Sequence, residues 1–244
     1  MIIRAAILLL PVLFSCKQQI DTAELIQSSD SLLTVLQQGV EEKQRITDFR
    51  EQFEQSRYYR YILEYKPYIK KYAKRYGFDW RLIVAQIMQE SKFNKSAKSP
   101  MGAQGLMQIM PTTERILGNE LDLQYIRNMP RENIAAGIYH MKKQFQMFPN
   151  ADMENRLKLS LASYNCGIGR ILDAQDIARF YRKEANDWRF VKEYLTHLKK
   201  SDWELHLEVW PQGKPVHGYF YGYQETIAYV DNIWELYDLY RHIL

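Results

Sequence analysis

The sequence has 244 residues, of which 46% are hydrophobic and 14% aromatic, so it has enough apolar material for a packed core and is not a disordered chain. Its formal net charge is +4, and its Lys and Arg residues form no run dense enough to indicate a nucleic-acid-binding protein. A mildly basic chain suits other anionic polymers equally well, so the charge alone does not identify a partner.

Residues 1–15 have the pattern of a targeting segment rather than of a folded element. Arg4 precedes an apolar run, residues 5–14, that is too short to span a bilayer as a permanent helix. The run ends in Leu-Phe-Ser followed by Cys16, which resembles a lipoprotein signal with a Cys that becomes acylated. We therefore expect a cleaved signal peptide at 1–15 and a lipid on Cys16. The alternative is an ordinary secretory signal in which Cys16 is incidental.

Residues 16–57 are polar and rich in Gln, Ser and Glu, and we interpret them as a partly helical tether. The remaining residues, 58–244, are expected to form one all-α domain. Its helices are predicted from apolar spacing and from capping residues, with Pro67 in a first turn, Gly77 at a C-cap and Asp79 at an N-cap. The predicted helices are 67–76, 80–91, 111–118, 131–148, 154–166, 168–181 and 226–244.

The helix at 80–91 carries an acid at the end of an apolar stripe. Trp80, Ile83, Ile87 and Glu90 share one face at 3.6 residues per turn. Burial against apolar neighbours and the negative end of the helix dipole both raise the pKa of a carboxyl group. A carboxyl that stays protonated near neutral pH is a general acid, so Glu90 is the candidate catalytic residue. The alternative is a solvated Glu at a helix end.

The loop that follows this helix favours the catalytic interpretation. It contains no Asp or Glu between Ser91 and Thr113, whereas it contains three Lys residues. Gly105 frees the backbone for a close approach, and the Gln108 amide can both donate and accept. A lone acid facing a polar loop indicates a cleft.

Two further segments leave alternatives open. Residues 204–223 alternate polar and apolar side chains before a Pro-Gln-Gly turn, which fits either a small β-hairpin or an aromatic loop over the cleft. Cys166, the second of the two Cys residues, has no His beside it in sequence, so we interpret it as a small buried thiol rather than a nucleophile.

Several other site chemistries have no support in the sequence. The five His residues show no HExxH or paired-Cys spacing, so we predict no metal and no cofactor. There is also no GxSxG elbow, no phosphate-binding GxxxxGK loop and no GxGxxG fingerprint.

Four short motifs, in order, carry a resemblance to a known family. Glu90-Ser91 is followed by Gly105-Leu106-Met107-Gln108, then by Ser163-Tyr164-Asn165-Cys166-Gly167, and finally by Glu225-Thr226 with Tyr229-Val230. This set resembles the soluble lytic transglycosylases, with Ser163 where that family usually has Ala. The resemblance implies a lysozyme-like fold of the goose-type lysozyme and transglycosylase kind. It also implies that Glu90 is catalytic and that the substrate is contacted by Ser91, Met107, Gln108, Tyr164, Asn165, Glu225 and Tyr229.

The resemblance also implies an activity. The expected substrate is the glycan strand of peptidoglycan, cleaved between N-acetylmuramic acid and N-acetylglucosamine without water to leave a 1,6-anhydro end. Ordinary glycosidases need two carboxylates, and the motifs offer one clear acid. The expected protein is a monomeric, lipid-anchored enzyme of the cell envelope that faces the periplasm, on the outer membrane. The alternatives are a hydrolytic muramidase on the same fold and a non-catalytic wall-binding lipoprotein.

Overall fold

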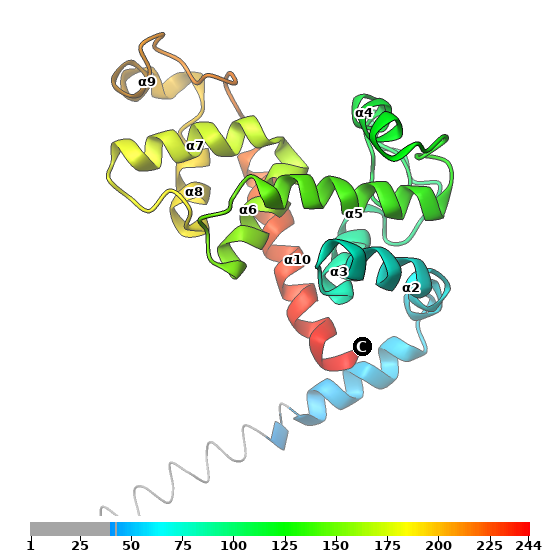
Figure 1. The fold of residues 1–244 in the computed structure, drawn as a ribbon. Helices are drawn as coiled ribbons and strands as arrows, with labels where there is room; N and C mark the ends of the chain where they lie inside the picture. The colour runs from blue at the N-terminus through cyan, green and yellow to red at the C-terminus, as the bar shows by residue number, and fades with distance from the viewer. Residues whose placement is uncertain (1–39, 42) are drawn as a thin grey trace, which may run out of the picture. The chain divides into compact units, whose positions relative to one another are not determined.

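The computed structural model describes residues 40, 41 and 43–244 (Figure 1). The predicted signal peptide and Cys16 lie outside these residues. The chain divides into two compact units, Met1–Asp48 and Phe49–Leu244. Residues 43–54 are helical.

The second unit is built from helices, which confirms the all-α prediction. In the described part of the chain the only β-type pairing consists of two isolated bridges within the loop at 92–110, Lys98 with Gln104 and Gln104 with Ile109. None of the described helices is long and apolar enough to cross a membrane. The helices are α2 (Arg57–Tyr76), α3 (Trp80–Ser91), α4 (Pro111–Leu121), α5 (Pro130–Gln146), α6 (Met153–Cys166), α7 (Ile168–Phe180), α8 (Trp188–Leu195), α9 (Trp203–Val209) and α10 (Tyr223–Ile243), with a 3-10 turn at Lys200–Asp202.

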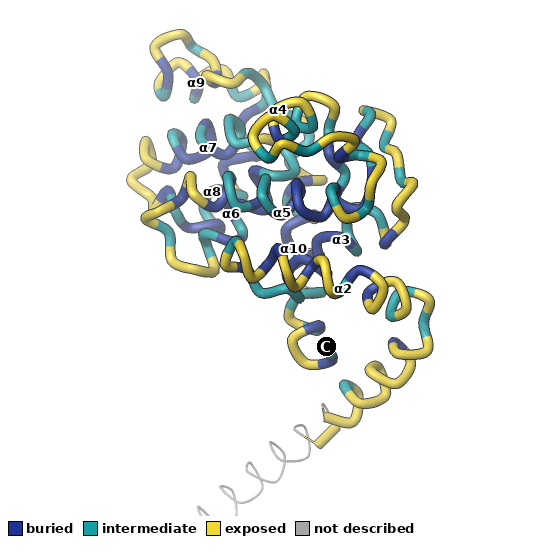
Figure 2. Tube along the Cα trace, turned by 45° about the vertical axis from the view of Figure 1, so that its right-hand side comes forward, coloured by how far each residue is buried: buried dark blue, intermediate teal, exposed yellow. Residues whose placement is uncertain are grey.

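Helix α3 is buried along its middle. Its residues from Leu82 to Ile87 are all buried, rather than a single stripe of them, because α3 packs between α2 and α10 (Figure 2). Helix α5 packs against α2 and α6, and α6 packs against α7 and α10. Six consecutive buried residues cover every side of a helix, so α3 has neighbours all around its middle, whereas its C-terminal end from Met88 to Ser91 is only half-buried.

The capping predictions on either side of this helix are confirmed. Gly77 ends α2 with φ +80°, a conformation that a residue with a Cβ adopts at a cost. The Asp79 carboxylate accepts a hydrogen bond from the Arg81 main-chain N–H at 2.9 Å and so caps the start of α3.

One predicted element is wrong, and one of the two alternatives for residues 204–223 is excluded. The helix expected to begin at Pro67 begins at Arg57, and Pro67 lies inside it. The helix tolerates Pro67 because the carbonyl that loses its donor belongs to Leu63, which is 46% exposed and lies on the solvent side. The β-hairpin considered for residues 204–223 is absent, because Trp203–Val209 is helical and residues 210–222 contain no strand. Two of the buried side chains there, His206 and Trp210, are four residues apart, which is a helical spacing.

Candidate active site

A cleft of about 590 Å³ brings the four sequence motifs together. Its walls come from the C-terminal end of α3, the loop before α4, the end of α6 and the start of α10. The lining residues are Gln89, Glu90, Ser99, Pro100, Met101, Ala103, Gln108, Met110, Tyr164, Asn165, Glu225, Ala228 and Tyr229. Residues separated by more than a hundred positions in the sequence therefore share one cavity.

Glu90 lies half-buried in this cleft at the last turn of α3. Burial raises the pKa of its carboxyl group to about 8, the hydrogen bond from Tyr229 acts in the opposite direction, and the nearby charge of Glu225 raises the pKa further. Glu90 is therefore mainly a neutral acid at pH 7. The Tyr229 hydroxyl donates to its Oε1 atom at 2.6 Å, so the acidic proton resides on Oε2.

Gln86 extends this contact one step deeper into the protein. Its Nε2 donates to the Tyr229 hydroxyl oxygen at 3.3 Å, and its side chain is completely buried. Because the Tyr229 oxygen accepts from Gln86, its single hydrogen is directed to Glu90. The sequence motifs did not identify Gln86. The available signal was an amide one helical turn before Glu90, in an otherwise apolar helix.

The Gly-Leu-Met-Gln segment is held from behind by Asn133 of α5. Asn133 Oδ1 accepts from the Met107 N–H at 2.7 Å, and its Nδ2 donates to the Gln104 carbonyl at 3.1 Å. Gly105 has φ +85°, and a Cβ there would lie 2.4 Å from the Asn133 amide nitrogen. Gly105 is thus required both for the turn and for the close approach of Asn133. Asn133 is another residue that the sequence motifs did not identify.

The predicted substrate contacts in this segment differ in what they can offer. Gln108 lines the cleft and uses its Nε2 hydrogens on the carbonyls of Gly105 and Ala97, so a ligand meets its amide oxygen. Met107 is fully buried and is not a lining residue, and its side chain packs against Gly137.

Ser91 also points into the protein rather than into the cleft. Its hydroxyl contacts the carbonyl oxygens of Leu106 at 2.9 Å and of Ile87 at 3.2 Å. Ser91 thereby ties the end of α3 to the motif loop. In the structure both Ser91 and Met107 position the cleft wall, instead of lining it.

Tyr164 and Asn165 at the end of α6 both line the cleft. The Tyr164 hydroxyl donates to the Met107 carbonyl at 2.7 Å, and burial followed by the charge of Glu90 raises its pKa well above 10, which keeps it neutral. Thr226 of α10 donates to Asn165 Oδ1 at 2.7 Å, which leaves the amide N–H groups of Asn165 for a ligand.

Cys166 follows these two residues but has the properties of an inert thiol. Burial raises the pKa of its thiol group to about 12. The reactive form of a cysteine is the thiolate, so this pKa argues against a nucleophilic role at neutral pH.

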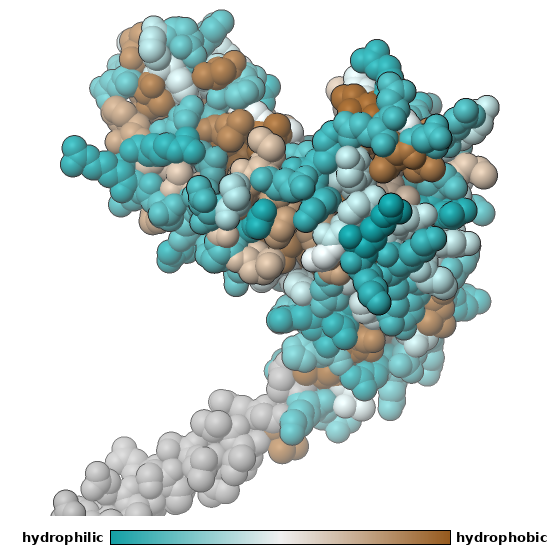
Figure 3. Space-filling model, in the orientation of Figure 1, coloured by the Kyte–Doolittle hydropathy of each residue, from teal (hydrophilic) through white to brown (hydrophobic). Residues whose placement is uncertain are grey.

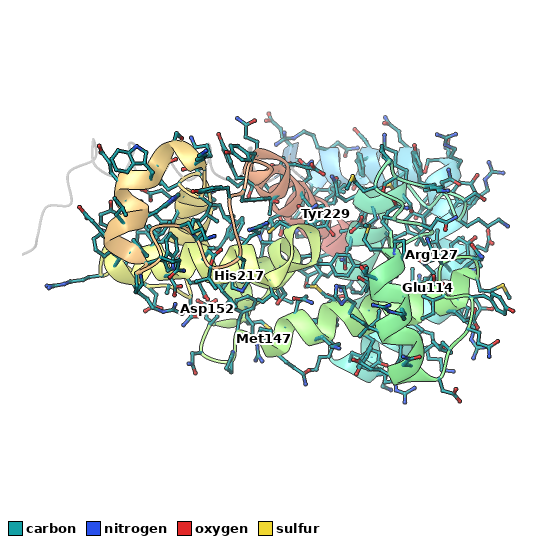
Figure 4. All side chains as sticks on the ribbon, turned by 90° about the horizontal axis from the view of Figure 1, so that it is seen from above. Glu114, Arg127, Met147, Asp152, His217 and Tyr229 are labelled. Atoms are coloured by element: carbon teal, nitrogen blue, oxygen red, sulfur yellow. The ribbon has the colours of Figure 1, made fainter. Side chains whose placement is uncertain are left out.

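Glu225 is the second carboxylate of the cleft. It comes from the first turn of α10, and its charge acts on Glu90. Glu114, the first acid after the motif loop, lies elsewhere and is held by Arg127, whose Nε is 2.6 Å from its carboxylate (Figure 4). Arg127 also donates to the Gly102 carbonyl at 3.2 Å, so this pair supports the loop rather than the chemistry. Within the described residues, no group of three His, Cys, Asp or Glu side chains could hold a metal ion.

Comparison with known proteins agrees with the motifs. The family described as "Transglycosylase SLT domain" matches residues 67–187. The "Membrane-bound lytic murein transglycosylase F" of Desulfosudis oleivorans is 34% identical over 188 residues, which is 76% of this chain and 38% of that protein. A relative named "Membrane-bound lytic murein transglycosylase F 1", from Alkalilimnicola ehrlichii, is 33% identical over 183 residues, which is 73% of this chain and 34% of that protein.

Among solved structures, the 70 kDa soluble lytic transglycosylase Slt70 of Escherichia coli is 26% identical, with a TM-score of 0.47 over 72% of this chain and 24% of that one. This chain spans little more than a third of the length of the curated relatives named above. The match to the family and the ordered motifs lead to one assignment: residues 67–187 are a domain of the transglycosylase SLT family.

Proposed function

We propose that this chain is a lytic transglycosylase that cleaves the bond between N-acetylmuramic acid and N-acetylglucosamine in peptidoglycan, and that Glu90 acts first as an acid and then as a base. The observation that carries the proposal is a neutral Glu90, with a pKa of about 8, held by Tyr229 at 2.6 Å in a cleft built from the family's motifs. The names of the relatives support the same activity.

In the first step the Oε2 proton of Glu90 passes to the glycosidic oxygen while the bond from C1 to that oxygen breaks. The 2-acetamido group of the N-acetylmuramic acid, the sugar to which this C1 belongs, stabilises the positive charge at C1. In the second step the Glu90 carboxylate takes the proton of the C6 hydroxyl, and O6 bonds to C1. Glu90 ends protonated, as it began, and no water is consumed.

The groups around Glu90 suit these two steps. The Tyr229 hydrogen bond to Oε1 stabilises the carboxylate that exists between them. Asn165 offers amide N–H groups and Gln108 offers an amide oxygen, because Thr226 takes the Asn165 oxygen and two carbonyls take the Gln108 hydrogens. One donor and one acceptor match the carbonyl and the N–H of an acetamido group, and we assign these two residues to that contact.

Hydrolysis is the second candidate, and Glu225 is the observation that favours it. A hydrolase needs a second carboxylate to activate water, and Glu225 is the other acid that lines the cleft. Transglycosylation is preferred because a hydroxyl on the substrate itself has a much higher effective concentration than a free water. A non-catalytic wall-binding protein would not need a protonated Glu90 in its cleft.

Digestion of purified peptidoglycan tests the proposal. Native protein should release muropeptides whose muramyl ends lack a reducing group and weigh one water less than hydrolysis products. Glu90→Gln should abolish release, whereas Glu225→Gln should retain anhydro products at a reduced rate. Reducing ends from the native protein would indicate a muramidase, and no release at all would indicate a binding protein.

We further propose that the mature chain is a monomer anchored by lipid on Cys16 to the outer membrane, facing the periplasm. The Leu-Phe-Ser-Cys pattern supports the anchor, and the relatives are named membrane-bound. Several acyl chains are needed for stable anchoring, because one chain binds membranes only marginally. Cys16→Ala should move the protein from the detergent phase to the aqueous phase. Native protein that carries no lipid by mass spectrometry would contradict the anchor.

A further inference from the structure

Helix α2 concentrates the positive charge of the chain. Its 20 residues include seven Lys and Arg side chains and one acid, Glu64. The net charge of +6 on this helix exceeds the +4 of the whole chain, so the remaining residues are acidic on balance. Such a local excess on one helix is a feature of binding surfaces for anionic partners.

The Lys and Arg side chains lie on the side of α2 that faces away from the core. Its buried residues are Ile62, Tyr65, Ile69, Tyr72 and Ala73, which face the core. The cations occupy the remaining circumference, and all except Lys66 are exposed: Arg57, Arg60, Lys70, Lys71, Lys74 and Arg75. Apolar and aromatic side chains are interspersed among them, with Leu63 at 46% exposure and Tyr61 and Tyr68 at 39% each. Figure 3 shows this region, at the lower right of the view, as mostly hydrophilic with small hydrophobic areas.

The cations of this surface form no ion pairs within the described residues, where no Lys or Arg of α2 is within ion-pair distance of a carboxylate. Lys66 and Lys70 instead lie over the Trp80 ring, at 4.8 and 4.9 Å from its centre. Burial lowers the pKa of Lys66, and the charges of Lys70 and Arg81 lower it further. Cations crowded in this way repel one another until an anion arrives.

We propose that the outer surface of α2 docks on an anionic phospholipid surface. Lipid fits this surface better than the wall polymer because Leu63, Tyr61 and Tyr68 can enter the interfacial region while the cations meet headgroups. The helix also follows the segment that bears the predicted lipid anchor. No residue of α2 lines the cleft, so docking leaves the candidate active site open to the wall.

Vesicle sedimentation tests this with the full chain carrying Cys16→Ala, so that no lipid anchor contributes. The probes are vesicles of phosphatidylcholine alone and vesicles containing phosphatidylglycerol. Binding should require phosphatidylglycerol and should weaken with salt. Arg60→Gln with Lys71→Gln and Lys74→Gln should lower the partition coefficient about a hundredfold, at about fivefold for each charge. These substitutions preserve helix propensity, and circular dichroism checks the fold.

Two matched variants separate the explanations. Removing three cations elsewhere, with Lys183→Gln, Lys200→Gln and Lys214→Gln, should lower binding much less than the α2 triple variant. Leu63→Gln should reduce binding to vesicles and leave binding to purified wall unchanged. Equal losses in the two triple variants, equal binding to neutral vesicles, or an effect of Leu63→Gln on wall alone would each overturn the proposal. Vesicle binding does not depend on catalysis, so the outcome is independent of the proposed function.

Discussion

Replacing Glu90 by Gln should remove activity and stabilise the protein at the same time. Gln keeps the size of the side chain and still accepts the Tyr229 hydrogen bond, but it can neither give nor take the catalytic proton. General acid–base catalysis contributes about 10²–10⁴-fold, so the rate of wall digestion should fall by at least that range. In the native protein the same rate should decline as pH rises through about 8, where Glu90 loses its proton.

The gain in stability follows from the raised pKa of Glu90. Its folded value of about 8 lies above the ordinary value of 4.5, so the folded protein binds the proton more tightly than the unfolded chain. The native fold therefore loses stability as pH rises between these values. One pKa unit corresponds to about 1.4 kcal/mol. Relative to a pH below 4.5, Glu90 therefore lowers the free energy of unfolding by about 1 kcal/mol at pH 5, about 3 kcal/mol at pH 7 and about 4–5 kcal/mol at pH 9.

Thermal unfolding of the two proteins at these three pH values measures this loss. For a chain of this size 1 kcal/mol corresponds to about 2–4 °C, so Glu90→Gln should raise the melting temperature by about 6–12 °C at pH 7, and by less at pH 5. Glu208→Gln, at an exposed acid, is the control and should show no comparable change with pH. A melting difference for Glu90→Gln that is the same at pH 5 and pH 9 would refute a Glu90 pKa near 8.

Three further outcomes are expected. Tyr229→Phe should slow wall digestion and shift its high-pH decline to higher pH, because the Tyr229 hydrogen bond lowers the pKa of Glu90. Gln86→Met should have no further effect in the Tyr229→Phe variant, because Gln86 acts on Glu90 through Tyr229. Independent effects of the two changes would exclude this chain of contacts from Gln86 through Tyr229 to Glu90. Gly105→Ala should destabilise the protein by about 2 kcal/mol or more, measured by chemical denaturation, because the added Cβ meets Asn133. Gly77 also has positive φ but has open space around it, so Gly77→Ala should cost only about 1 kcal/mol. Equal costs would show that Asn133 moves aside without a penalty. The thiol of Cys166 should react slowly with a disulfide reagent at pH 8, given a pKa of about 12, and rapid labelling of the folded protein would contradict that pKa.

Much of the fold could be predicted because local signals were strong. Asp79 and Gly77 mark helix boundaries by side-chain chemistry and by backbone conformation, and both lie where predicted. The start of α2 was missed because a Pro usually marks the first turn of a helix. Pro67 instead lies inside α2, which is held in place by the burial of its opposite side. The helix at Trp203–Val209 was also missed. Polar and apolar residues alternate there as they do in a strand, but Leu207, which a strand would bury, is exposed in the helix.

The site was predictable where a motif carries a reacting group and not where packing assigns the role. Glu90 and Tyr229 were both predicted from motifs as site residues, and in the structure their side chains lie 2.6 Å apart. Which side of the chain a motif residue presents depends on partners distant in sequence, and this explains why Met107 points inward. Gln86 and Asn133 lie outside the motifs and act through contacts that appear only when the helices are assembled.

The central claim is that Glu90 cleaves the glycosidic bond without water, and digestion in ¹⁸O-labelled water tests it most directly. If the C6 hydroxyl of the substrate attacks C1, the muramyl end takes up no label and carries a 1,6-anhydro ring. If the Glu225 carboxylate instead activates a water, ¹⁸O appears at C1 of every new reducing end. Unlabelled anhydro ends would agree with the proposed reaction, and labelled reducing ends would contradict it.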